Sequence, residues 1–293
     1  MLDVRRLRLL RELAHRGTIA AVAEALAFSP SAVSQQLTAL EREAGVPLLE
    51  RSGRGVALTP AARGLVVHAE AVLARLEQAA AELAGARRGL AGPLRIGTFP
   101  SAARVVIPAA LVALGREHPA LEPMVREMDP AGVADALRAG ELDVALVHDY
   151  DFVPSAREPG VQSEPLFTET MYLAAATLGP ATVDDCRESE WITATPGTLC
   201  HAMALHACQA AGFAPRVRHR IDDFSTVLAL VAAGQGVALV PRLGAVDPPP
   251  GVALHPLAMS RRTAVAFRGG AAGHPAVAAF TAAVRTSLPA DLR

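Results

Sequence analysis

The chain has 293 residues, of which 51% are apolar and 19% are charged, and its formal net charge is −1. This composition excludes a disordered chain and leaves enough length for two or three domains with buried cores. Apolar runs of about 18 residues, as a membrane span needs, are absent, and the charged N-terminus is unlike a secretory signal. Three cysteines fit a reducing compartment, so we expect a cytoplasmic protein.

The charge is unevenly distributed along the chain. Residues 1–64 hold nine arginines against six acidic residues, whereas residues 65–293 hold nineteen arginines against twenty-three acidic residues. All 28 basic residues are arginine, and lysine is absent. A positive N-terminal segment on a nearly neutral chain suits contact with a polyanion such as DNA at that end alone.

Three short helices are predicted at the N-terminus, over residues 4–15, 18–27 and 30–44. Ser29 and Pro30 form a strong start signal for the third, because serine is a preferred N-cap and proline is pre-organised for the first helical position. The tight break between the second and third helices predicts a helix-turn-helix.

The third helix has two unlike faces. Its apolar residues, at helical spacing, are Val33, Leu37, Leu40 and Ala44. The opposite face is short and polar, and we expect it to contact base edges, because glutamine, arginine and hydroxyl side chains hydrogen-bond to them. The alternative, a solvated surface helix, would usually carry several charges. The residues of this polar face are Ser31, Ser34, Gln35, Thr38 and Arg42.

A hairpin and a long helix follow. Residues 48–58 read as two strands around a Gly- and Arg-rich tip, and Thr59-Pro60 repeats the helix-start signal for a helix that ends near residue 86. Apolar residues recur at heptad spacing along it, which predicts a coiled-coil seam between two chains, whereas a buried helix within one chain is the alternative. The expected dimerisation residues are Leu65, Val72, Leu76 and Leu83.

Residues 85–93 form a Gly- and Arg-rich hinge, after which strands and helices alternate. This rhythm predicts a parallel sheet covered by helices. The expected strands are 94–96, 123–127, 144–147, 169–175, 191–193, 216–221, 237–240 and 264–267, and the expected helices are 103–116, 132–139, 200–211, 225–233 and 275–287.

The chain resembles the LysR-type transcriptional regulators over essentially its whole length. The matching residues near the N-terminus are Gly17-Thr18-Ile19, Ala20, Ala21, Ala23, Leu26, Ser29, Ala32, Ser34, Gln36, Leu37, Leu40-Glu41, Gly45-Val46-Pro47-Leu48-Leu49, Glu50-Arg51 and Leu58-Thr59. Downstream, PLRIGTFPSAARVVIPAAL and AGELDVALV look like the first subdomain of that family's effector domain, and LALVAAGQGVALVPRL looks like the second.

The resemblance implies an α/β protein: an all-α winged helix-turn-helix over residues 1–58, a linker helix and hinge over 59–91, and a two-lobed domain like periplasmic binding proteins over 92–293. Lobe I would comprise about 92–162 plus 263–293, and lobe II about 163–262, with crossovers near 162–166 and 259–263. It also implies a dimer, or a tetramer built from two dimers, on a dyad-symmetric promoter site.

In the family the hairpin is a wing that lies beside the minor groove, so its two arginines are candidates for phosphate or minor-groove contact, although solvated hairpin arginines are the alternative. The complete set of expected DNA-binding residues is Thr18, Ser29, Ser31, Ser34, Gln35, Thr38, Arg42, Arg51 and Arg54.

Ligands of open α/β sheets bind beyond the carboxyl ends of the strands. The resemblance places Ser101 where relatives hold an effector carboxylate, but Pro130 replaces a hydroxyl residue of many relatives, and Asp129 would repel an anion and attract an amine. Helix capping is an equal alternative for Ser101 and for Thr198 in the other lobe.

His148 could supply a positive charge near neutral pH, although a surface histidine is the alternative. The resemblance also suggests that Phe224 faces the cleft. The expected effector-binding residues are therefore Ser101, Asp129, His148, Thr198 and Phe224.

Two alternatives to an effector-controlled regulator remain. Cys200 and Cys208 lie about 12 Å apart on one predicted helix, too far for a disulfide without unwinding, yet the resemblance to peroxide-sensing relatives keeps a thiol-switched regulator open. An α/β small-molecule enzyme with an accessory helical domain is less favoured, because GxSxG, GxGxxG, Walker A and HExxH motifs are absent. We expect no catalytic residue, metal or cofactor.

Overall fold

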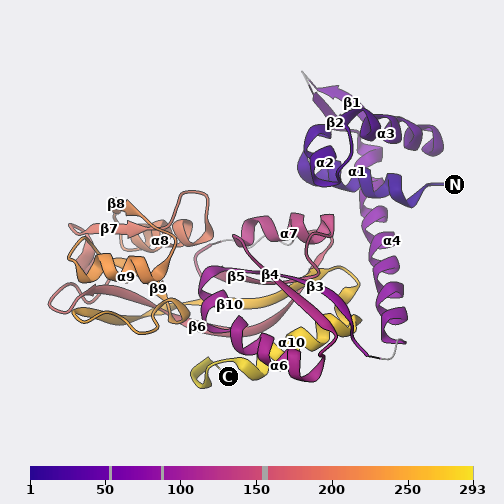
Figure 1. The fold of residues 1–293 in the computed structure, drawn as a ribbon. Coiled ribbons are helices and arrows are strands. Elements are labelled where there is room, and N and C mark those ends of the chain that lie inside the picture. Colours follow the sequence, from indigo (N-terminus) through magenta and orange to yellow (C-terminus); the bar gives the residue numbers. More distant parts are fainter. Residues whose placement is uncertain (53–54, 87–88, 154–157, 293) are drawn as a thin grey trace.

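The computed structural model describes residues 1–52, 55–86, 89–153 and 158–292. Arg54, one of the two wing arginines expected to contact DNA, lies outside these residues. The described chain forms an N-terminal domain, one long helix and a two-lobed α/β domain (Figure 1). None of its described helices combines the length and the apolar character that crossing a membrane requires.

The N-terminal domain is the predicted helix-turn-helix with a hairpin. Each of its three helices begins at a side chain that caps a backbone N–H group, namely Asp3, Thr18 and Ser29. The elements are α1 (Val4–Arg16), α2 (Ile19–Ala25), α3 (Pro30–Ala44), β1 (Leu49–Ser52) and β2 (Gly55–Leu58). The apolar face of α3 packs into a core with α1, α2 and the start of the long helix, as the periodicity predicts.

The long helix α4 (Pro60–Gly85) begins at the Thr59 cap and spans about 39 Å at 1.5 Å per residue. Its first turns complete the N-terminal core through Ala62 and Ala69, and a later turn packs against the α/β domain. The packing there is close: a side chain on Gly270, which has φ +92°, would collide with the Ala74 carbonyl. One chain therefore buries one face of α4 by itself.

A six-stranded sheet of order β4-β3-β5-β10-β6-β9 forms the framework of the α/β domain. β3 (Gly92–Thr98) is parallel to β4 (Leu121–Glu127) and to β5 (Val144–Tyr150). β10 (Val252–Arg268) is antiparallel to β5 and to β6 (Val161–Ala176), and β6 is antiparallel to β9 (Ala238–Pro241).

The segments where crossovers between the lobes are expected belong to two long strands. Residues 162–166 and 259–263 lie inside the continuous strands β6 and β10, which extend beyond the strands expected over 169–175 and 264–267. Irregular pairing between Pro256 and Ser260, and again between Thr263 and Ala264, interrupts the register. Because such irregularities bend and twist a strand without ending it, the two strands can serve both lobes.

Lobe I is a three-layer structure, with α6 (Ile107–Glu117) and α10 (Pro275–Ser287) on one face of the sheet and α7 (Pro130–Ala139) on the other (Figure 1). The single helix predicted over 103–116 is wrong: the structure has α5 (Pro100–Val105) and then α6. Pro108 lacks the N–H group that would continue the first helix, so a new helix begins there.

Lobe II contains the parallel pair β7 (Glu190–Thr193) and β8 (Arg216–Arg220), with α8 (Leu199–Ala210) and α9 (Phe224–Ala232). Trp191 is fully buried at the centre of its core. Short 3₁₀ turns complete the described chain at Asp184–Cys186 (η1), Arg242–Gly244 (η2), Ala271–Gly273 (η3) and Ala290–Leu292 (η4).

Candidate functional site

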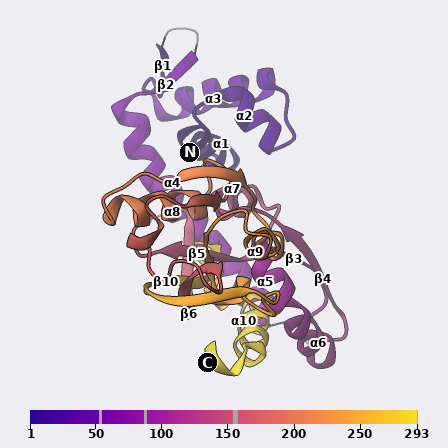
Figure 2. The same cartoon turned by 90° about the vertical axis from the view of Figure 1, so that its left-hand side faces the viewer.

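The polar face of α3 is open in the folded chain. Ser31, Ser34, Gln35, Thr38 and Arg42 are all exposed, on the side of the helix opposite its buried core residues. α3 and the β1–β2 hairpin lie at the end of the molecule away from the large sheet, so the α/β domain does not cover them (Figure 2).

Of the other residues expected to contact DNA, two already hydrogen-bond within the domain and one is exposed. The hydroxyl of Thr18 accepts from the N–H of Ala21 at 3.1 Å, and that of Ser29 accepts from the N–H of Ala32 at the same distance. Both hydroxyls therefore have a structural role as helix caps. Arg51 is exposed on β1, as a phosphate contact requires.

A cleft of about 250 Å³ lies between the two lobes, and every residue expected to bind an effector lines it. Its walls also include polar residues that the sequence analysis did not single out. The five expected residues are Ser101, Asp129, His148, Thr198 and Phe224, and the additional polar ones are Glu127, Tyr150, Cys200, Asp222 and Arg261.

A buried ion pair forms part of the cleft wall. The Nε of Arg261 on β10 donates to Oε1 of Glu169 on β6 at 2.8 Å, and Nη2 of Arg261 donates to the hydroxyl of Ser101 at 2.9 Å. The second oxygen of Glu169 accepts from the N–H of Leu243 at 2.7 Å. Burial lowers the pKa of Arg261, but pairing with Glu169 outweighs this effect and holds the pKa above its usual value. The guanidinium thus stays charged while its charge is neutralised locally.

His148 does not supply the positive charge considered from the sequence. Its ring stacks edge-to-face with Phe99 and Tyr150, at centroid distances of 4.6 and 5.1 Å. Burial, and then the positive charge of Arg261, lower the pKa of His148 well below its usual value. The imidazole is therefore neutral at pH 7, and the surface-histidine alternative is also wrong, because its Nδ1 atom is buried.

The capping alternative holds for part of the cleft. Thr198 accepts from the N–H of His201 and donates to the carbonyl of Thr195, and Asp129 caps α7 through the N–H of Ala131 at 2.8 Å. Ser101, in contrast, makes no side-chain cap and bonds to Arg261 instead. Capping and ligand contact can coexist at Asp129, because only one of its carboxylate oxygens is used.

Sequence reasoning missed Glu169 and Arg261, although a signal for both exists. Alternate residues of β6 from Phe167 to Leu173 point to the core, and Glu169 falls on that buried face. Arg261 holds the corresponding place in β10, between the buried Met259 and Thr263. A charged residue on the apolar side of an alternating strand implies a buried partner.

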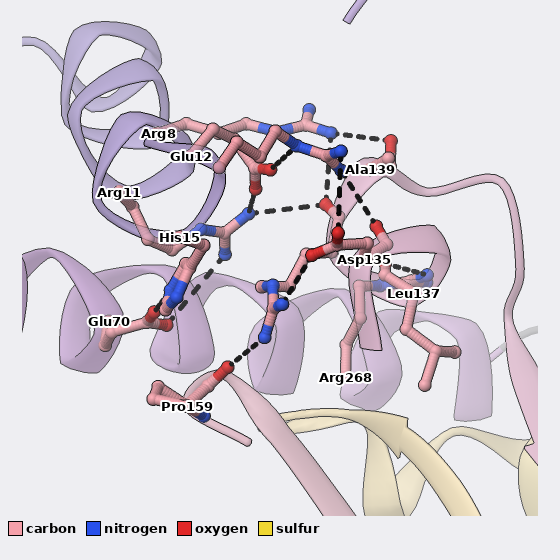
Figure 3. Close-up of polar contacts among 12 residues, drawn as sticks. Arg8, Arg11, Glu12, His15, Glu70, Asp135, Leu137, Ala139, Pro159 and Arg268 are labelled. Carbon is pink, nitrogen blue, oxygen red and sulfur yellow. Dashed lines mark hydrogen bonds and ion pairs between the residues drawn. The ribbon is translucent and has the colours of Figure 1, made fainter. Parts of the chain in front are cut away.

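The N-terminal domain also contacts lobe I through a polar interface (Figure 3). Nη2 of Arg8 donates to the carbonyl of Ala139 at 2.8 Å, and Nη2 of Arg11 donates to that of Arg138 at 3.3 Å. Glu12, which is fully buried, pairs with both Arg11 and Arg16. Arginines at the inner side of the N-terminal domain therefore contact the end of α7.

Contacts from α4 extend this interface. Glu70 of α4 bonds to His15 of α1 at 2.8 Å, and Glu77 accepts from Arg268 at the end of β10 at 3.0 Å. Arg268 also donates to the carbonyl of Leu142 at 2.6 Å. α1, α4 and lobe I are thus linked by charges from three parts of the chain.

The four expected dimerisation residues divide into two groups. Leu65 packs partly against the N-terminal core of its own chain. Val72, Leu76 and Leu83 are 39%, 49% and 71% exposed. At helical spacing these three share a face that points away from the Glu70, Ala74 and Glu77 side, which contacts lobe I.

The three cysteines are poor candidates for a thiol switch. Burial raises the pKa of Cys200 to about 11 and that of Cys208 to about 12, which keeps both as thiols near neutral pH. Both lie on the intact helix α8, where their separation along the axis is about 12 Å. Cys186 is buried in the same core as Cys208.

Comparisons with known proteins agree with this architecture. Residues 4–63 match the family described as bacterial regulatory helix-turn-helix protein, lysR family, and residues 87–289 match the LysR substrate binding domain. The probable HTH-type transcriptional regulator LrrA of Synechococcus elongatus is 31% identical over 98% of each chain. A probable hydrogen peroxide-inducible genes activator of Streptomyces viridosporus is 32% identical, over 91% of this chain and 88% of its own.

Among solved structures, full-length CbnR in complex with its target DNA is 27% identical, with a TM-score of 0.54 over 98% of this chain and 99% of its own. The matches cover the helix-turn-helix, the linker helix and both lobes. The chain therefore belongs to the LysR family of DNA-binding transcriptional regulators, whose promoter binding is modulated by a small-molecule effector.

Proposed function

We propose that α3 is the helix that reads DNA sequence in this regulator. The observation that carries the proposal is its exposed face of hydroxyl, amide and guanidinium groups, held in place by a buried apolar face. Gln35 has the shape for a bidentate contact with adenine, and Ser31, Ser34 and Thr38 can bond to several bases. Arg42 and Arg51 would contact phosphates or the minor groove beside them.

Two chains would pair through α4, by the stripe Val72, Leu76 and Leu83. The proposal is supported by the exposure of these side chains, because a helix leaves few large apolar residues open to water unless a partner covers them. A two-fold pair would place two copies of α3 on a dyad-symmetric site. Since bacterial DNA lies in the cytoplasm, we expect the protein to act there and to act by binding, without catalysis.

The cleft between the lobes would hold the effector, contacted by Ser101, Asp129, His148, Thr198 and Phe224. This role of the cleft is supported by its lining, because residues of both lobes and several polar groups surround one cavity. A ligand that touches both lobes favours one relative arrangement of them, and this would change how the paired helices lie on the promoter.

A thiol switch is the second candidate, favoured by the peroxide-inducible activator among the relatives. The raised pKa values of Cys200 and Cys208 and the intact helix between them argue against it. Effector control is therefore our first proposal.

Replacing Gln35 by alanine should weaken binding to a duplex selected from a random library by the wild-type protein. The expected loss is about 1–3 kcal/mol, because a bidentate base contact disappears, while affinity for a scrambled duplex stays the same. Fluorescence anisotropy at fixed salt measures both. Gln209→Ala, an exposed glutamine on α8, is the matched control. Equal losses on the two duplexes would show that Gln35 does not read a base.

The double change Leu76→Glu and Leu83→Glu should convert the wild-type oligomer into single chains, because it places charges in the seam. Size-exclusion chromatography with light scattering gives the mass. Leu178→Glu alters a fully exposed leucine outside α4 and should leave the mass unchanged. A double variant that remains a dimer would exclude this stripe as the pairing surface.

We also propose that His148 contacts the effector as a neutral imidazole. Because its folded pKa is lowered, the unfolded chain binds a proton that the folded chain does not, so stability falls as the pH drops below about 6.5. His148→Gln should remove up to about 1.4 kcal/mol per pH unit from the slope of unfolding free energy between pH 6.5 and 5.5. Urea denaturation measures the slope, and His68→Gln on α4 is the control. An unchanged slope in His148→Gln would contradict the neutral state of His148 in the folded chain.

A further inference from the structure

The cleft carries an excess of negative charge. Glu127 and Asp129 of lobe I and Asp222 of lobe II line it, and all three carboxylates are exposed. The positive charge of Arg261 is balanced by Glu169, and His148 is neutral. A ligand that brings only negative charge would therefore meet net repulsion at the mouth of the cleft.

The inner wall of the cleft offers donors instead. The hydroxyl of Tyr150, a residue only 1% exposed, lies close to Arg261 and Cys200 but makes no hydrogen bond of normal geometry with a described residue, and Nδ1 of His148 makes none either. The hydroxyl of Ser101 accepts from Arg261 and so keeps its own proton to donate. Because buried polar groups with poorly made hydrogen bonds are costly, a ligand with acceptor atoms would gain by pairing with the hydroxyl groups of Tyr150 and Ser101.

We propose that the effector is a small ammonium-bearing carboxylate of amino-acid size. Its carboxylate would accept from Ser101, Tyr150 and Arg261, and its ammonium group would lie at the side of Asp129 and Asp222. This inference rests on the proposed role of the cleft as the effector site. An amino acid is favoured over a simple carboxylate because Pro130 offers neither a hydroxyl nor an N–H group to an anion, while Asp129 adds a negative charge that attracts an ammonium group.

Matched pairs of compounds test the ligand class on the full-length protein. L-leucine is compared with 4-methylpentanoate, L-glutamate with glutarate, and L-phenylalanine with 3-phenylpropanoate, each at 5 mM in a thermal unfolding assay, followed by calorimetric titration. At least one amino acid should raise the unfolding midpoint by about 2 °C or more, and its partner without the amino group should not.

Variants assign the binding to the two carboxylates. Asp129→Asn keeps a helix cap and Asp222→Asn keeps an acceptor, so neither should disturb the fold. Each variant should lower the affinity for the amino-acid ligand about 10-fold or more. Asp184→Asn, which changes an exposed acid outside the cleft, should leave this affinity unchanged. Amino-acid binding that both asparagine variants leave unchanged would overturn the inference.

Tighter binding of a compound without the amino group, abolished by Ser101→Ala, would also overturn the ligand class while supporting the cleft as effector site. If no compound of either kind bound, the proposed class would be wrong. Binding that no cleft substitution affects would count against the cleft itself.

A second inference comes from α7, which touches both sites. Its N-terminal end, at Asp129 and Pro130, lines the cleft, and its C-terminal end, at Arg138 and Ala139, is bonded by Arg8 of the N-terminal domain. Ten residues separate these ends by about 15 Å. One short, rigid helix therefore spans the distance between effector site and DNA-binding domain.

The contact at the C-terminal end joins groups of opposite charge. The last carbonyls of a helix lack partners within it and carry partial negative charge, so guanidinium groups bind there well. Arg8 and Arg11 donate to the carbonyls of Ala139 and Arg138 in the last turn of α7, and Arg16 donates to that of Asp135 one turn earlier. Figure 3 shows Arg8 and Arg11 reaching this end of α7 from α1.

We infer that α7 transmits effector binding to the DNA-binding domain of the same chain. A ligand at Asp129 would shift α7 as a unit, and the arginine contacts would carry the shift to α1. This inference rests on the proposed function, and coupling between two binding sites is reciprocal, so DNA on α3 must in turn affect α7.

Hydrogen–deuterium exchange tests the reciprocal effect without a known effector. A random 30-bp duplex at low salt is the probe, because contacts with phosphates do not depend on sequence. In the wild type, the duplex should slow exchange in α3 and change exchange in residues 129–140 by about two-fold or more. Arg8→Ala should keep the first effect and weaken the second, because Arg8 bonds only to α7 carbonyls among the described contacts, while Arg11 and Arg16 keep theirs.

Arg5→Ala alters an exposed arginine on the same helix and should behave as the wild type does. A wild-type α7 that does not respond to DNA, or an Arg8→Ala variant with the full response, would overturn the inference. Absence of protection in α3 would count against DNA contact by that helix and not against the coupling alone.

Discussion

The pairing of Arg261 with Glu169 is the constraint on which the α/β domain depends. It joins the two long strands that run through both lobes, and its remaining hydrogen bonds reach Ser101 at the start of α5 and the backbone of η2. Neither charge can be buried alone without a large cost, so the two strands, α5 and η2 must keep this arrangement. This arrangement therefore fixes one wall of the cleft.

The same side chains often have two roles in this molecule. Asp129 caps α7 and faces the cleft, and Ser29 caps α3 and lies at the edge of its polar face. The helix α4 likewise completes one core and leaves an apolar stripe exposed. Such double use explains why capping and ligand contact could not be separated on the sequence alone. A cap uses one lone pair of a carboxylate or hydroxyl and leaves the others free.

Local signals in the sequence predict much of the N-terminal domain. Caps such as Ser29 and the spacing of Val33, Leu37 and Leu40 define α3 almost to the residue, because helix ends and faces depend on neighbouring residues. Strand ends and the family resemblance together nominated Ser101, Asp129, His148, Thr198 and Phe224, and the structure brings them together around one cavity. Their contact with a ligand stays a prediction.

What the sequence could not predict depends on pairing between distant segments. Arg261 and Glu169 are 92 positions apart, and the neutral state of His148 arises from burial that no local pattern reveals. The excess of arginine at the N-terminus was interpreted as a DNA-facing charge. Arg8, Arg11 and Arg16 account for a third of the nine arginines there, and they face the α/β domain instead.

The use of arginine for the contacts with α7 has a chemical consequence. A guanidinium remains protonated at every pH a living cell reaches, whereas an ammonium group can be acetylated and so neutralised. With lysine absent from the whole sequence, no side-chain amine exists for an acetyltransferase to modify. The contact between the two domains therefore cannot be weakened by lysine acetylation.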